Sequence, residues 1–214
     1  MRFLRFLALL FVLAMPLAWL GSPAPAAVSL RPSLFGTEEV FSADNSAFAK
    51  WNDMLRRFNA ERRAGAPDAW RALVAALPGL DPRAQLERVN MVINGYPYRP
   101  SMVNWGERNH WETPFEFLRK SGQCQDYAIA KYMLLRDAGM PASSLRVVVL
   151  RDTRQSLDHA VLVAYLDGEP MLLDNQIDAV VPAAAVSHYQ PYYSISEEGW
   201  WLHRGANARY AAFR

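Results

Sequence analysis

The stretch SGQCQDY (121–127) decides the fold, because it holds the only cysteine among 214 residues and marks the start of a helix. Residues at helical spacing continue to Ala138, where Gly139 ends the pattern. In the first turn of a helix, free N–H groups and the positive end of the dipole favour a thiolate. Gly122 is expected to let a substrate backbone approach closely. A lone cysteine is ordinarily a small buried side chain, so a reactive Cys124 needs a base nearby.

The chain then changes from a helical to a strand pattern rich in Val and Leu. Three stretches have this composition: LRVVVLRD (145–152), HAVLVAYLD (159–167) and PMLLDNQ (170–176). The stretch YYSISEEGWWLH (192–203) is expected to add one further strand. A helix followed by strands in succession predicts the α+β class, with the Cys124 helix packed on an antiparallel sheet.

His159 is the candidate base, and strand geometry supplies its partner. Asp167-Gly168 is typical of a type I′ hairpin turn. With a two-residue loop, Asp174 lies opposite Val161, on the same face as His159, so the two side chains are diagonal neighbours. A three-residue loop would break this match. An Asp–His pair alone is often structural, but beside a helix-start cysteine it predicts a catalytic set: Cys124 as nucleophile, His159 as base and Asp174 as orienting acid.

These residues predict acyl transfer. The thiolate attacks a carbonyl, the imidazole delivers a proton to the leaving amine, and water resolves the thioester. The Cys124 N–H and one further donor would hold the oxyanion. Trp111 and Gln123 are both candidates for that second donor, and a packed aromatic in the core is the other interpretation of Trp111.

The first 26 residues are typical of a signal peptide. A basic MRFLR, an apolar run over 6–20 and a small-residue stretch follow one another. We therefore expect a periplasmic protein, with an uncleaved inner-membrane anchor as the alternative. Removing 1–26 takes away two of the 23 basic residues and none of the 21 acidic ones, so the mature chain is close to neutral. This balance excludes electrostatic binding of nucleic acid, and a single cysteine excludes an intramolecular disulfide.

Two lobes follow the signal peptide. Residues 27–95 are expected to form a lead-in and a helical lobe, and residues 96–214 a catalytic lobe. The lead-in at 28–43 has no clear period, and residues 96–112 form an aromatic-rich loop. The expected helices run from Asp44 or Asn45 to about Arg63, from Asp68, from Asp81-Pro82 to Gly95, and from the capping box at 113–116 to about Lys120.

Five stretches between about residues 85 and 203 carry a resemblance to a known family. They are NWGERNHWETPFEFL, GQCQDYAIAKYMLLRDAGMP, DHAVLVAY, LLDNQ and YYSISEEGWWL. In these motifs and their order, the chain resembles the bacterial transglutaminase-like cysteine proteinases. The resemblance implies a papain/transglutaminase-like core behind an N-terminal helical lobe. It places the family's Cys, His and Asp positions on Cys124, His159 and Asp174.

The resemblance also implies a function. Members of the family act as periplasmic endopeptidases that cut near the N-terminus of a giant surface adhesin, often at paired alanines, and so control biofilm attachment. An inner-membrane receptor that senses cyclic di-GMP sequesters the protease. Two alternatives remain open: transglutaminase- or amidase-type acyl transfer on cell-envelope peptides, and a binding module that has kept the fold without the activity.

The chain departs from the family beside the nucleophile. The family usually has acidic residues there, as in GDCEDY, and they are tied to calcium binding. Here Gln123 and Gln125 replace them, and Asp126 remains as a candidate calcium neighbour. Amides supply oxygen but no charge, so calcium affinity should drop. No cofactor is required by the chemistry, and we expect weak or absent calcium dependence.

Overall fold

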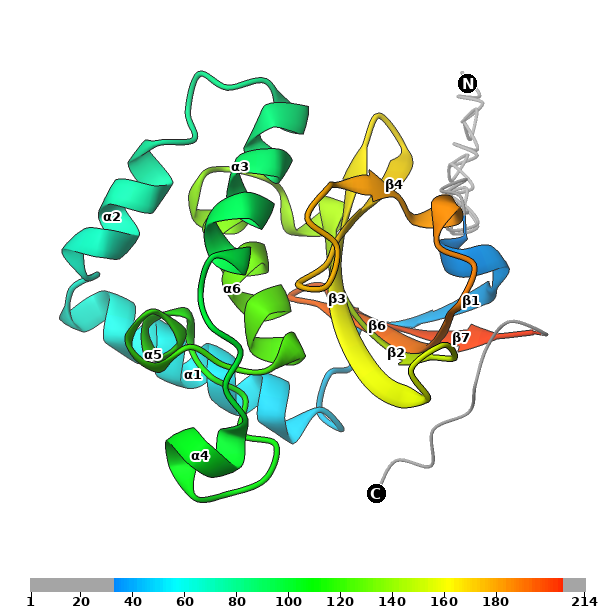
Figure 1. Cartoon of the computed structure of the whole chain (residues 1–214), viewed down its shortest axis with the longest axis horizontal. Helices are drawn as coiled ribbons and strands as arrows, with labels where there is room; N and C mark the ends of the chain where they lie inside the picture. The colour runs from blue at the N-terminus through cyan, green and yellow to red at the C-terminus, as the bar shows by residue number, and fades with distance from the viewer. Residues whose placement is uncertain (1–32, 206–214) are drawn as a thin grey trace, which may run out of the picture. The chain divides into compact units, whose positions relative to one another are not determined.

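The computed structural model of the chain describes residues 33–205, so the predicted signal peptide lies outside the described residues. Helices and strands form an α+β structure, which confirms the predicted class (Figure 1). The helices are α1 (Ala49–Ala64), α2 (Asp68–Ala75), α3 (Pro82–Asn94), α4 (Ser101–Trp105), α5 (Pro114–Lys120) and α6 (Cys124–Asp137). The strands are β1 (Glu38–Ser42), β2 (Leu145–Asp152), β3 (Leu157–Leu166), β4 (Glu169–Leu173), β5 (Val181–Pro182), β6 (Tyr189–Ser196) and β7 (Gly199–Arg204).

Helix α6 is the central element of the helical layer. All of its residues from Gln125 to Leu135 are buried, as expected for a helix enclosed on every side. It packs on β2 and β3 of the sheet and is flanked by α3 and α5 (Figure 1). Aromatic side chains from α1, α2 and α5 fill the space around it, with Phe58, Trp70 and Phe115 in mutual edge-to-face contact.

The sheet has seven strands in the order β1-β7-β6-β2-β3-β4-β5, and all its pairings are antiparallel. Val161 and Val163 lie in a second apolar cluster on the face away from α6, where Leu34 and Tyr189 also pack. Both faces of the central strands are therefore covered, which explains why HAVLVAYL is a nearly continuous apolar run.

The β3–β4 hairpin has the predicted geometry. Asp167 and Gly168 both have positive φ angles, 48° and 86°, as a type I′ turn requires. Leu162 pairs with Leu173, the register expected from a two-residue loop. The prediction from the turn is confirmed.

Two stretches contain more strand than the sequence predicted. The lead-in at 28–43, expected to be irregular, contains β1, which pairs with β7 at the other end of the described chain. Most β1 side chains are at least partly exposed, so the strand shows no apolar alternation. The stretch 192–203, expected to be one strand, is the β6–β7 hairpin with a turn at Glu197-Glu198. Acidic turn residues flanked by polar Ser196 gave only a weak turn signal.

Two helix boundaries also differ from expectation. Helix α1 begins at Ala49 rather than Asp44 or Asn45, because Asp44 accepts the Ser46 N–H at 2.9 Å and holds a turn there. The loop expected at 96–112 contains the short helix α4. The Asp81 cap on α3 and the Thr113 capping box on α5 are as predicted.

Candidate active site

His159 and Asp174 meet in the structure as the hairpin register predicted. His159 lies near the start of β3, and Asp174 directly follows β4. Their side chains join through a hydrogen bond of 2.9 Å between the imidazole Nε2 and the carboxylate Oδ1. Both residues are buried, so water does not compete for this bond.

Two further groups hold the Asp174 carboxylate. The hydroxyl of Tyr189, at the start of β6, donates to Oδ2 at 2.5 Å, and the backbone N–H of Gln176 donates to Oδ1 at 2.9 Å. The Tyr189 ring also lies 5.8 Å from the imidazole of His159, centroid to centroid. Sequence reasoning missed Tyr189, because nothing local to it reveals that β6 runs beside β2 and so reaches this pair.

The buried pair has shifted ionisation. Burial by itself lowers the pKa of His159, but hydrogen bonds to Asp174 and Cys124 outweigh burial and raise the pKa to about 9. Burial raises the pKa of Asp174, whereas its bond to His159 and the donors around it lower the pKa below the ordinary value overall. At neutral pH the pair is therefore an imidazolium beside a carboxylate.

Cys124 is the first residue of α6, and Gln123 is its N-cap. The thiol is half-buried and lies close enough to His159 to contribute to the raised pKa of the imidazole. Its sulfur also lies 3.6 Å from Oε1 of Gln125. The structure thus brings together the three residues that the sequence assigned to one site.

Packing inside the protein gives one reason for glycine at position 122. A Cβ added there would lie 2.6 Å from both Cβ and Oδ2 of Asp126. The need for glycine therefore comes from the interior, where Asp126 packs against the turn before the helix. The approach of a substrate backbone to Gly122 stays a prediction.

The Asp126 side chain stabilises the start of α6 by accepting hydrogen bonds from two backbone N–H groups. Its Oδ2 accepts the Gln123 N–H at 2.8 Å, and its Oδ1 accepts the Glu112 N–H at 2.9 Å. Burial raises the pKa of Asp126 well above the ordinary value, and the nearby Glu112 adds to the effect. The side chain of Gln123 bonds to Ser101, whose backbone N–H lies 3.1 Å from Oε1.

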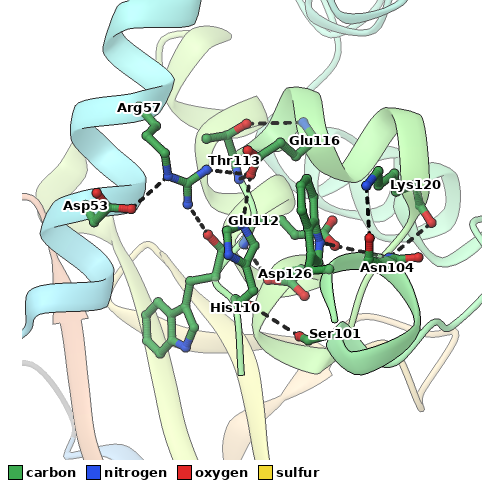
Figure 2. Close-up of polar contacts among 12 residues, drawn as sticks. Asp53, Arg57, Ser101, Asn104, His110, Glu112, Thr113, Glu116, Lys120 and Asp126 are labelled. Atoms are coloured by element: carbon green, nitrogen blue, oxygen red, sulfur yellow. Dashed lines mark hydrogen bonds and ion pairs between the residues drawn. The ribbon is translucent and has the colours of Figure 1, made fainter. Parts of the chain in front are cut away.

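Trp111 belongs to a network that ties the loop before α5 to its neighbours. Its indole N–H donates to Asn109 Oδ1 at 3.0 Å, and its ring is in the core, which agrees with the packed-aromatic interpretation. Figure 2 shows Arg57 of α1 beside this loop and the first turn of α5. Arg57 donates to the Trp111 carbonyl oxygen and to Glu116 of α5, each at 2.5 Å. The His110 carbonyl accepts from Gln125 Nε2 at 3.2 Å, which joins the same loop to α6.

A thiol at a helix start beside a buried imidazole that is bonded to a carboxylate is an arrangement that can carry out covalent acyl transfer. Across residues 33–205, no cluster of three or more His, Cys, Asp or Glu side chains could hold a metal ion. No helix within this range is long and apolar enough to cross a membrane.

Comparison with known proteins gives consistent matches. The family model for bacterial transglutaminase-like cysteine proteinases matches residues 77–205. Calcium-bound LapG from Legionella pneumophila is similar over 74% of this chain and 93% of its own, at 28% identity and a TM-score of 0.58. EGTA-treated LapG from the same organism matches 70% of this chain and 86% of its own, at 28% identity and a TM-score of 0.59. No curated protein matches the sequence.

Proposed function

Because the chain belongs to the family of bacterial transglutaminase-like cysteine proteinases, we propose that it is a LapG-like periplasmic endopeptidase that uses Cys124, His159 and Asp174 as its catalytic triad. The family and the similarity to LapG identify a cysteine peptidase. The observation that carries the triad is the buried 2.9 Å bond between His159 and Asp174, with the thiol of Cys124 as the second partner of the same imidazole.

The proposed reaction has two halves. The Cys124 thiolate attacks the scissile carbonyl, the C–N bond breaks, and the His159 imidazolium gives its proton to the leaving amine. Neutral His159 then takes a proton from water, the resulting hydroxide attacks the thioester, and the C–S bond breaks to release the acid and the thiolate. Asp174 remains ionised throughout and stabilises each imidazolium that forms.

The oxyanion of each tetrahedral intermediate needs two donors. The Cys124 backbone N–H is one, because the first N–H groups of a helix have no intrahelical acceptor. Of the two candidates for the second donor, Gln123 is favoured, since the Trp111 indole N–H already donates to Asn109. Gln123 flanks the nucleophile, and Ser101 holds its side chain by the oxygen.

We propose that calcium has little or no role in this chain, although one LapG structure is calcium-bound. Calcium prefers several free carboxylate or carbonyl oxygens. Here the Gln123 oxygen accepts from Ser101, and both oxygens of Asp126 accept backbone N–H groups. These residues do not fit the ion, and no step of the mechanism passes through it.

The proposed substrate is the N-terminal region of a large surface adhesin, whose release would end biofilm attachment. The proposed regulator is an inner-membrane receptor that senses cyclic di-GMP and sequesters the enzyme. Both rest on the family resemblance. The periplasmic location rests on residues 1–26, whose pattern is that of an export signal.

Cleavage of a defined protein tests the proposal. The mature protein would be incubated with the N-terminal segment of a large repeat adhesin from the same organism, with Cys124→Ala as a control. Specific cleavage that Cys124→Ala abolishes supports the proposal. If the protein instead joins a labelled primary amine to the substrate faster than water hydrolyses it, the enzyme is a transferase and the endopeptidase assignment is wrong. No reaction with either acceptor, together with an unreactive thiol, would favour the binding module.

A further inference from the structure

Side chains on one face of α3 form hydrogen bonds with the backbone of Asp174 and of the residues that follow it. Polar residues of α3 at spacings of seven and four, which share a helix face, donate to backbone carbonyls of the segment after β4. Asn94 makes the bond closest to the site, from Nδ2 to the Asp174 carbonyl at 2.8 Å. The others are Asn90 Nδ2 to Asp178 O at 2.8 Å and to Ile177 O at 3.2 Å, and Arg83 Nη2 to Val180 O at 2.6 Å.

Lys131 connects this row to the helix of the nucleophile. It lies on α6 two turns after Cys124, is fully buried, and donates from Nζ to Asn90 Oδ1 at 2.7 Å. An ammonium group can only donate, so it fixes the amide of Asn90 with its oxygen toward Lys131 and its NH₂ toward the carbonyls of the Asp174 segment. One chain of contacts thus runs from α6 through Asn90 of α3 to the segment that follows Asp174.

Burying the charged group of Lys131 in the core has a large desolvation cost. Within residues 33–205, Asn90 is the hydrogen-bond partner found for Lys131, and an apolar side chain of similar length would avoid the desolvation cost. Burial also lowers the pKa of Lys131 to about 7, with Asp174 acting in the opposite direction. Core packing alone would not require a charge at this position, and the contact of Lys131 with Asn90 directs that charge toward the row that holds the Asp174 segment.

We propose that Lys131, Asn90 and Asn94 are positioning residues, which hold the Asp174 carboxylate in register with the imidazole of His159 and with the helix of Cys124. The inference rests on the proposed catalytic function of those three residues. It assigns to α3 a role in catalysis through the position of Asp174.

The test compares Lys131→Met and Asn94→Ala with Leu86→Ala, a core truncation on α3. Two readouts report on the site: the alkylation rate of Cys124 by iodoacetamide from pH 5 to 10, and the NMR titration of the His159 ring. We expect the positioning variants to slow alkylation at pH 7 about tenfold and to lower the titration midpoint of His159, because a displaced acid no longer supports the imidazolium. Leu86→Ala should lower thermal stability and leave both readouts unchanged.

A double-mutant cycle shows whether the effect passes through the acid. In an Asp174→Asn background, Lys131→Met and Asn94→Ala should slow alkylation no further. Full additivity, or no effect of either variant in the wild-type background, would overturn the inference. If Lys131→Met does not fold, Asn94→Ala carries the test, because Asn94 is only half-buried. If His159→Ala and Asp174→Asn leave alkylation unchanged, the proposed triad itself fails, a result distinguishable from failure of the positioning role alone.

Discussion

Replacing Asp174 with Asn isolates the charge of the acid from its shape. The asparagine side chain has the same size, its oxygen can face His159, and its NH₂ can meet the Tyr189 hydroxyl where Oδ2 lay. The hydrogen bonds can therefore be kept in number while the negative charge beside the imidazole is lost.

The size of the effect follows from the pKa of His159. The bonds to Asp174 and Cys124 raise that pKa from 6.5 to about 9 against an opposing contribution from burial. Such a shift corresponds to about 3 kcal/mol in favour of the imidazolium. If the pKa returns to about 6.5, the imidazolium fraction at pH 7.5 falls from roughly 97% to roughly 9%. We expect at least a tenfold loss of peptide cleavage at that pH, because the imidazolium is the proton donor to the leaving amine.

The assay is a pair of titrations. The chain has four histidines, and the ring signal absent from His159→Gln identifies His159 in spectra of labelled protein. In the wild type, cleavage should decline as the pH rises through about 9, where the imidazolium loses its proton. In Asp174→Asn the pH at which cleavage declines should be at least one unit lower than in the wild type. The pH midpoint of the His159 ring titration should fall by a similar amount. An unchanged ring titration in Asp174→Asn would refute the assignment of Asp174 as the acid that supports His159.

Three further predictions concern groups around the site and the sheet. Gly122→Ala should slow Cys124 alkylation severalfold at pH 7, because the new Cβ would collide with Asp126; a rate equal to the wild type would show that the turn adjusts freely. Excess EGTA should change neither the thermal midpoint nor the cleavage rate, and a chelator-sensitive rate would show that Gln123 and its neighbours bind calcium after all. Burial lowers the pKa of His203 to about 4 in the folded state. As the pH falls from 6.5 to 4, His203 therefore takes up a proton in the unfolded state but stays neutral in the folded state. The free energy of unfolding should fall by up to about 3 kcal/mol more in the wild type than in His203→Gln over that range, as measured by urea denaturation; equal slopes would contradict it.

Local signals account for the parts of the site that the sequence predicted. The helix that begins at Cys124 is visible from the helical spacing of its residues and from Gly139 beyond its end. The His159–Asp174 pair follows from a two-residue turn, because the period of two along a strand links the faces of both arms. Each inference spans only a few residues of chain, and the structure contains both features.

Long-range pairing accounts for what the sequence did not predict. Tyr189 reaches Asp174 only because β6 lies beside β2, a neighbour relation that no local pattern specifies. Asn90 and Lys131 had the appearance of ordinary helix residues, and their contact depends on how α3 crosses α6. The lead-in strand β1 is identified by its partner β7 rather than by its own composition.

The pairing of β1 with β7 also has a consequence for the order in which the chain can fold. Glu38 pairs with Arg204, so this edge of the sheet closes only after nearly all of the described chain is available. The segment from α5 through Asp174, the residue directly after β4, contains Cys124, His159 and Asp174 in continuous sequence and can associate earlier through shorter loops. We therefore expect Cys124 and His159 to come together earlier in folding than β1 and β7, whose pairing is the late step that completes the domain.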